Sequence, residues 1–244
     1  MRYLVISDIH ANLEALEVCL EDAGRRGYDR TVVLGDVVGY GPDPNPVIER
    51  IVALSPVAIV RGNHDKIAYG IEQAEGFNVA ARAAAQWTLN ALSSDSRSWL
   101  TNLPQGPTIV DDVFEICHGS PVDEDEYIFD ELDARRAIDA ARQRLCLFGH
   151  THVAMIFQLQ GRSIGLITPS AEGMKLEPDA RYLINPGSVG QPRDTDPRAA
   201  YAIYDADAQV IGMYRVDYPV EKTQEKMAAA GLPEPLIRRL AAGR

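Results

Sequence analysis

The sequence predicts an α/β protein in which two mixed β-sheets pack together, with helices on the outside. Over about the first 150 residues, short apolar runs alternate with segments of helical spacing, as expected for parallel strands joined by helices. The strand runs after that point follow one another in the manner of hairpins. Residues able to bind metal come directly after the first strand runs, so we expect them to gather where those strands end.

Five apolar runs of strand length end beside side chains that commonly bind metal ions. The runs cover residues 3–7, 31–34, 57–60, 113–117 and 145–148. The polar residues that follow them include Asp8 and His10, then Asp36, Asn63 and His64, then His118, His150 and His152. All five histidines of the chain belong to this set. The second run stops at a glycine and presents a single acid, Asp36, between the first ligand pair and the others.

Helices are predicted between these strands from capping residues and from apolar spacing. Asn12 is the expected N-cap of a helix whose apolar stripe fades at Gly24. Asn45 is the expected N-cap of a helix over residues 47–54, with proline at its first position. Further helices are expected over residues 78–92, 96–103 and 132–142. We expect residues 66–112, whose helices carry no ligand, to be a helical segment that shapes the pocket.

The second part of the chain predicts strands over residues 155–159, 163–167, 182–184, 200–204 and 210–216. A loop rich in turn residues, 185–193, interrupts them. Two helices, over residues 220–230 and 234–242, are expected in the C-terminal segment 219–244. Because the sequence shows no internal repeat and no low-complexity linker, residues 1–244 are expected to form a single domain.

Composition argues against several classes of protein. The formal net charge of −11 is unfavourable for proteins that bind nucleic acid through its phosphates, and no apolar run approaches the length of a membrane span. The amino terminus leads straight into a strand, without a signal peptide. Three cysteines in apolar runs are expected to be buried reduced thiols, which favours a cytoplasmic location. The sequence leaves open whether the chain forms a homo-oligomer.

The ligand set itself predicts a centre with two metal ions. It consists of two carboxylates, one amide oxygen and four imidazoles, from Asp8, His10, Asp36, Asn63, His118, His150 and His152. Oxygen and nitrogen ligands without thiolate suit manganese, iron, zinc or nickel. Seven ligands are too many for one tetrahedral ion, but they suit two ions that share Asp36. A single histidine is more often exposed or packed in a core, but five that all follow strand runs favour the metal site.

These motifs resemble those of the calcineurin-like metallophosphoesterases. The resemblance is carried by Asp8-x-His10, Gly35-Asp36-x-x-Gly39, Gly62-Asn63-His64-Asp65, His118-Gly119 and Gly149-His150-Thr151-His152, in the family's order. The loops that begin at Gly39 and at Asn185 are similar to those of a small prokaryotic branch with phosphodiesterases and phosphatases. The family's fold is a four-layer αββα sandwich, which agrees with the strand and helix pattern.

The resemblance also implies roles for individual residues. One metal ion would be held by Asp8, His10, Asp36 and His152, and the second by Asp36, Asn63, His118 and His150. His64 would not bind metal but would lie beside the scissile phosphate as a general acid or charge stabiliser, held by Asp65. Tyr40 and Arg193 are further candidates for substrate contacts, although an arginine in a turn is more often only solvated.

The expected activity is hydrolysis of a phosphate ester, by attack of a hydroxide that bridges the two ions. We expect a small soluble phosphodiester as substrate. The alternatives are a phosphomonoesterase, acting on proteins, nucleotides or dinucleoside polyphosphates, a nuclease, and a scaffold without catalysis. The acidic balance disfavours the nuclease, and the complete ligand set with His64 disfavours the scaffold.

Overall fold

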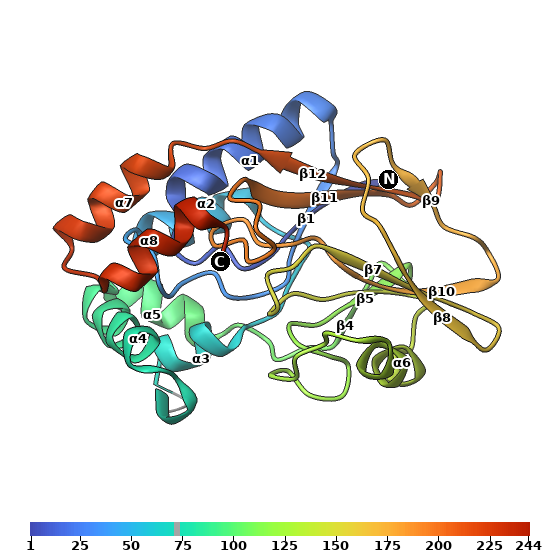
Figure 1. Ribbon diagram of the computed structural model, residues 1–244, viewed down its shortest axis with the longest axis horizontal. Coiled ribbons are helices and arrows are strands. Elements are labelled where there is room, and N and C mark those ends of the chain that lie inside the picture. The colour runs from blue at the N-terminus through green and yellow to red at the C-terminus, as the bar shows by residue number, and fades with distance from the viewer. Residues whose placement is uncertain (71–73) are drawn as a thin grey trace.

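Two six-stranded β-sheets form the centre of the structure, a computed structural model that describes residues 1–70 and 74–244 (Figure 1). The first sheet has the order β3-β2-β1-β11-β12-β9, and the second has the order β4-β5-β6-β10-β7-β8. The strands of the first are β1 (Arg2–Ile6), β2 (Arg30–Val33), β3 (Ala58–Ile59), β9 (Met174–Lys175), β11 (Ala199–Asp205) and β12 (Val210–Val216). Those of the second are β4 (Thr108–Val110), β5 (Phe114–Ile116), β6 (Leu145–Leu147), β7 (Met155–Gln160), β8 (Ser163–Ile167) and β10 (Ala180–Asn185).

Both sheets are mixed, as the sequence predicts. In the first sheet β1, β2 and β3 run parallel, while β11 and β12 continue it in antiparallel fashion. In the second sheet β5, β6 and β10 run parallel, and β4, β7 and β8 pair with them or with each other in antiparallel fashion. The carboxyl ends of parallel strands lie at one edge of a sheet, so the loops after β1, β2, β3, β5 and β6 can meet.

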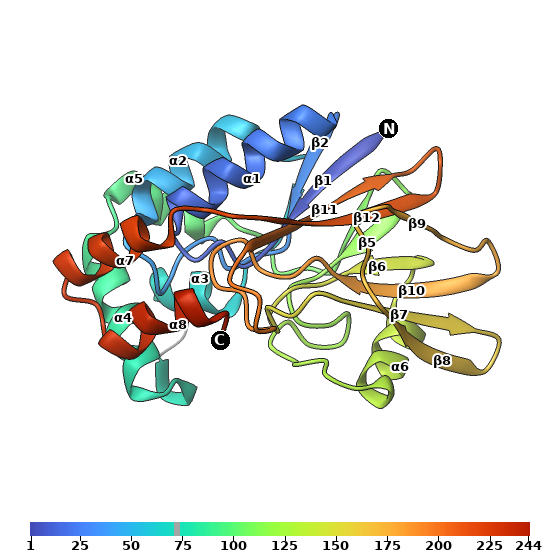
Figure 2. The same ribbon diagram turned by 45° about the horizontal axis from the view of Figure 1, so that its top comes forward.

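Helices cover the outer faces of both sheets (Figure 2). The helices are α1 (Leu13–Arg26), α2 (Pro44–Leu54), α3 (Asn63–Ala68), α4 (Val79–Ala91), α5 (Ser94–Thr101), α6 (Glu131–Ala140), α7 (Val220–Ala229) and α8 (Glu234–Ala242), with a 3₁₀ turn at Ala74–Gly76. Helices α1 and α2 lie along the outside of the first sheet, and α6 packs on the second. The C-terminal pair, α7 and α8, contacts α1 and α4. In the described residues, no helix is long and apolar enough to cross a membrane.

The alternation of side chains along β1 shows how one strand supplies two cores. Tyr3 and Val5 belong to the core between the two sheets, whereas Leu4 and Ile6 pack into the layer beneath α1. Successive residues of a strand point to opposite faces, so a strand buried on both sides must be apolar throughout. This explains why the early strands appear in the sequence as continuous apolar runs. The three cysteines are buried and free, as expected.

One local expectation is wrong, and one helix extends beyond its apolar stripe. Helix α1 continues past Gly24, where the stripe fades, to Arg26, and the following Gly27 has a positive φ of 81°. Helix α2 begins at Pro44 after Asp43, and Asn45 is not its cap. The Asn45 side chain instead donates to Ala91 O and accepts from Ser93 N, both at 2.9 Å, which ties α2 to the connection between α4 and α5.

Candidate metal centre

The seven predicted ligands lie together where the loops of the two sheets meet. Asp8 and His10 follow β1, Asp36 follows β2, and Asn63 begins α3. His118 follows β5, while the other two histidines of the set follow β6. Apart from Asn63, which is half-buried, all of these side chains are buried.

Five of these residues have a left-handed backbone, which is uncommon outside glycine. They are Asp8, His10, Asp36, His150 and His152, with φ between 49° and 66°. Such conformations cost free energy, about 1–3 kcal/mol each, and persist where the surrounding structure holds them. They explain how Asp8 and His10, two residues apart, both reach the same side: the chain is no longer a flat strand there.

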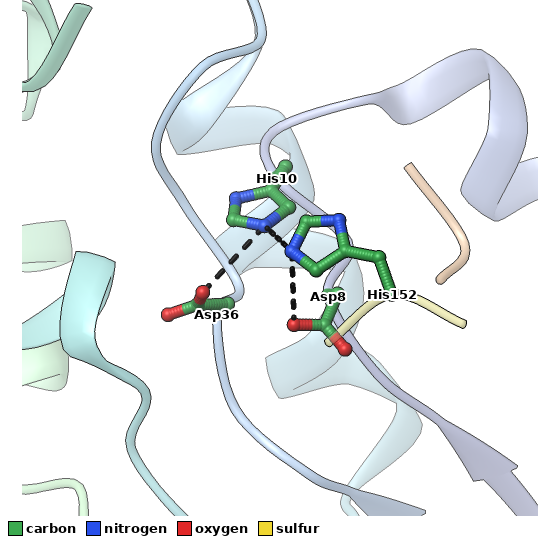
Figure 3. Close-up of side chains that lie close together, drawn as sticks. All are labelled: Asp8, His10, Asp36 and His152. Carbon is green, nitrogen blue, oxygen red and sulfur yellow. Dashed lines mark hydrogen bonds and ion pairs between the residues drawn. The ribbon is translucent and has the colours of Figure 1, made fainter. Parts of the chain in front are cut away.

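The first ligand cluster is formed by Asp8, His10, Asp36 and His152, each with a ligand atom within 4.8 Å of the others (Figure 3). His10 Nε2 lies 3.1 Å from His152 Nε2 and 3.5 Å from Asp36 Oδ2. His152 Nε2 lies 3.4 Å from Asp8 Oδ1. Nitrogen and oxygen atoms from four separate loop positions therefore surround one point.

The second cluster is formed by Asp36, His118 and His150. Asn63 joins it, because its Oδ1 lies 3.3 Å from His118 Nε2. His118 Nε2 is 3.5 Å from Asp36 Oδ2, the same oxygen that lies 3.5 Å from His10. One carboxylate oxygen is thus common to both clusters.

This shared oxygen provides a test of whether the residues fit a cation. Among the described residues, buried Asp36 Oδ2 has no hydrogen-bond partner, whereas Asp36 Oδ1 accepts from the backbone N–H of His64 at 2.9 Å. A buried carboxylate oxygen without a donor is costly, and a cation would compensate it. The donor set of oxygen and nitrogen atoms without thiolate also suits divalent transition metals. The residues present therefore fit a metal ion on either side of Asp36.

Each histidine ligand is oriented by a backbone carbonyl. Nδ1 of His10, His118 and His152 lies at hydrogen-bond distance from Val38 O, Leu34 O and Gln191 O, respectively. His150 uses its other nitrogen, with Nε2 3.1 Å from Asp125 O. Because a carbonyl only accepts, the ring nitrogen facing it carries a proton, and the opposite nitrogen is the one that can face a metal ion.

The charge state of the cluster favours metal binding. Burial holds the pKa of His10 and His152 well below the usual value and lowers the pKa of His150 to about 3. Burial disfavours ionised Asp36, but His118 and the other histidines outweigh it and keep its pKa well below the usual range. The same pairing, opposed by burial, raises the pKa of His118 to about 10. Three imidazoles are thus neutral, the form that binds metal, beside an ionised carboxylate.

His64 lies beside the clusters but belongs to neither of them. Its ring packs 4.2 Å from the Tyr40 ring, 4.5 Å from Phe77 and 5.0 Å from His10, measured between centroids. Burial lowers the pKa of His64 to about 4.

The expectation that Asp65 holds the His64 ring is wrong. Asp65 Oδ1 accepts from the backbone N–H of Val38, and Oδ2 accepts from that of Gly62. The carboxylate therefore joins the loop after β2 to the loop after β3. Its effect on His64 is indirect, through the backbone at the start of α3.

Tyr40 and Arg193, the two candidates for substrate contacts, both lie beside the first ligand cluster. The Tyr40 ring is 4.8 Å from the His10 ring, and Arg193 Cζ lies 5.7 Å from the Tyr40 ring centroid. The backbone N–H of Arg193 donates to His152 O at 3.1 Å.

A cavity of about 290 Å³ opens beside the second cluster, lined by Asn63, Ile67, Gly76, Phe77, Asp125, Tyr127 and His150. The Tyr127 ring lies 3.8 Å from the His150 ring, and Phe77 covers His64. Sequence reasoning missed both aromatic residues, because each stands in a loop outside any motif. The cavity gives room for an organic group next to the ligand clusters.

Comparison with known proteins gives a consistent result. Residues 1–209 match the family described as the calcineurin-like phosphoesterase superfamily domain. An uncharacterized protein of Methanocaldococcus jannaschii is 36% identical, over 98% of this chain and 97% of its own length.

Solved structures give the same picture. A metallophosphoesterase from Sphaerobacter thermophilus is 42% identical, with a TM-score of 0.89 over 100% of this chain and 99% of that one. A hypothetical protein from Pyrococcus horikoshii has a TM-score of 0.80 at 22% identity, over 100% of this chain and 98% of that one, and shows likeness of fold alone.

Proposed function

The chain belongs to the calcineurin-like phosphoesterase superfamily, and on that premise we propose that it is a metal-dependent hydrolase of small phosphodiesters. The observation that carries this proposal is the oxygen shared by the two ligand clusters, the unpaired Asp36 Oδ2. A buried acid between two groups of imidazoles, of which three are neutral, suits a pair of divalent ions better than any role in folding.

In the proposed centre Asp8, His10, Asp36 and His152 hold one ion, and Asp36, Asn63, His118 and His150 hold the other. When bound, two such ions stabilise negative charge on phosphate oxygens and lower the pKa of a water molecule. The backbone carbonyls behind the histidines fix the direction of each ligand, so the site needs little rearrangement to bind metal. Manganese, iron, zinc and nickel all suit this donor set.

The protein's own contribution to catalysis is assigned to His64. Its ring lies against His10 yet outside both clusters, where it can face the phosphate without occupying a metal position. There the N–H of its neutral ring would offset charge on the phosphate, and the protonated ring would donate a proton to the departing oxygen. We propose that Asp65 acts only through the loop backbone that positions His64.

The preference for a small diester rests on the shape and charge of the surroundings. The cavity beside His150 can take one organic group of the ester, and its walls include the ring of Phe77 from the segment 66–112. The formal net charge of −11 disfavours a long polyanion, because binding one depends on many cationic contacts.

The first test is hydrolysis of bis(p-nitrophenyl) phosphate by the full chain. We expect turnover with added Mn²⁺, loss of turnover when a chelator removes the metal, and recovery when Mn²⁺ is restored. Excess duplex DNA should inhibit weakly. Strong and salt-sensitive inhibition by DNA would support a nuclease instead, and faster turnover of phosphomonoesters on a mixed substrate panel would replace the diester preference.

A second test uses Gly39, which makes room for His64. A Cβ atom at Gly39 would lie 2.6 Å from His64 Nδ1, so Gly39→Ala must push the ring aside. Displacement of a catalytic group by about 1 Å can cost 10²-fold, so we expect turnover to fall by about that factor while metal content is unchanged.

Gly70→Ala is the matched control for this variant. Gly70 has a similar backbone, with φ 83° against 91° at Gly39, but an added Cβ would meet no atom of the described residues within 4 Å. Both variants therefore carry the same type of backbone strain, and only Gly39→Ala disturbs His64. Equal losses of turnover in the two variants would remove His64 displacement as the cause.

A further inference from the structure

Two arginines that are far apart in the sequence converge on one buried glutamine. Arg193 lies in the loop after β10, and Arg239 lies on α8. Arg193 donates to Gln191 Oε1 from Nη2 at 2.8 Å, and Arg239 donates to the same oxygen from Nη1 at 3.2 Å. Gln191 is 1% exposed, so this oxygen does not face open solvent. Both guanidinium groups are half-buried.

The pair has no acidic partner. Within residues 1–70 and 74–244, neither guanidinium forms a salt bridge, and the amide oxygen they share carries no charge. Some half-buried arginines, such as Arg61 with Glu124, pair with a carboxylate, whereas Arg144 and Arg181 donate to backbone carbonyls. Burial, followed by the charge of Arg193, lowers the pKa of Arg239. Two like charges have therefore been brought together without a salt bridge in the described residues, and an acid that Arg193 influences through space, Asp8, belongs to the first ligand cluster.

The two arginines lie next to the candidate metal centre and are connected to it through Gln191 and Tyr40. Gln191 O accepts from Nδ1 of His152 at 2.7 Å, and Arg193 lies over the ring of Tyr40, which contacts both His10 and His64. The positive charges thus stand next to the first ligand cluster. Neither arginine is among the residues that line the cavity beside His150, which belongs to the second cluster.

We propose that Arg193 and Arg239 form a subsite for a second phosphate group of the substrate. The substrate class is then a phosphoester with an additional phosphate, either a bisphosphate or a compound with a phosphoanhydride. Guanidinium groups bind phosphate through paired, charge-assisted hydrogen bonds, and a phosphate between them would offset their repulsion. This inference rests on the proposed function, since it places the second phosphate relative to the metal centre.

The test is calorimetric binding to the full chain loaded with Mn²⁺, at a fixed excess of free metal. The probes are methylphosphonate, with one anionic group, and the diphosphonates with one, two or three carbons between the phosphorus atoms. At least one diphosphonate should bind about 10-fold more tightly than methylphosphonate, because charge-assisted hydrogen bonds to a second group add to the affinity. Arg239→Ala should remove most of this advantage.

Arg238→Ala is the control on the same helix. Arg238 is largely exposed and paired with Glu234, so its loss should leave the ratio of the two affinities unchanged. If Arg239 only tethered α8 to the loop, Arg239→Ala would lower the melting temperature and weaken both classes of probe equally. An unchanged ratio in Arg239→Ala, or no diphosphonate preference in the wild-type protein, would overturn the proposal.

Binding is measured without turnover, so the two proposals can fail separately. A chain that prefers a diphosphonate but hydrolyses no phosphoester retains the subsite and contradicts the proposed function. A chain that hydrolyses bis(p-nitrophenyl) phosphate without that preference retains the function and contradicts the subsite.

Discussion

Asp36→Ala is expected to release metal from both sites and to reduce phosphodiester hydrolysis by at least about 10³-fold. The reason is the position of Asp36 Oδ2, 3.5 Å from a histidine of each cluster and without a hydrogen-bond partner in the part of the chain that the structure describes. Removing the oxygen leaves two groups of imidazoles without a common anion. Loss of Lewis-acid stabilisation worth several kcal/mol corresponds to several powers of ten in rate.

The measurement is elemental analysis of purified protein, where the wild type should carry close to two transition-metal ions per chain. His118→Ala provides the comparison, since it belongs to the second cluster alone and should lower metal content only in part. Asp29→Ala, at a position outside both clusters, controls for the loss of an acidic side chain. An Asp36→Ala protein with one site still fully occupied would show that the acid is not shared.

Most of the ligand positions could be predicted because the buried strands appear in the sequence as apolar runs. The ligands are the polar residues that follow those runs. A strand buried on both faces must be apolar, so a polar side chain directly after it stands out. Asp36 after β2 and His118 after β5 are examples. The shared role of Asp36 followed from its place in the ligand order, and the geometry of the two clusters agrees with it.

What the sequence did not reveal depends on long-range contacts. Asn45 has the residue type of a helix cap, but its side chain is used by the connection between α4 and α5. Asp65 was expected to hold His64, yet it binds the backbone of two loops that only the tertiary fold brings together. No local pattern could place Arg239 beside Arg193, because α8 reaches the centre only when the C-terminal helices pack on α1 and α4.

Short strands also could not be predicted from the periodicity of apolar residues in the sequence. Strands β4 and β9 have three and two residues, too few for an alternation to be visible. Helix α3 begins within the motif Gly62-Asn63-His64-Asp65, where the ligand pattern obscured the cap that Asp65 provides by accepting from the backbone N–H of Gly62.

The second large effect is expected for His64, whose replacement should lower turnover without loss of metal. His64→Ala should reduce turnover by about 10²–10⁴-fold, the usual contribution of a positioned general acid. Because the ring packs against Tyr40 and Phe77, His64→Gln, which keeps more of the side-chain volume, should be made in parallel. Elemental analysis of both variants should give the wild-type metal content, and a metal-depleted His64→Ala protein would assign this residue to coordination.

The leaving group then separates proton donation from simple charge stabilisation. p-Nitrophenolate departs readily without a proton, whereas the alkoxide released from a dinucleotide requires one. If His64 donates that proton, His64→Gln should slow hydrolysis of a thymidine dinucleotide by about 10-fold or more beyond its effect on bis(p-nitrophenyl) phosphate. Equal losses on both substrates would leave His64 as a stabiliser of charge on the phosphate, because that role does not depend on the group that departs.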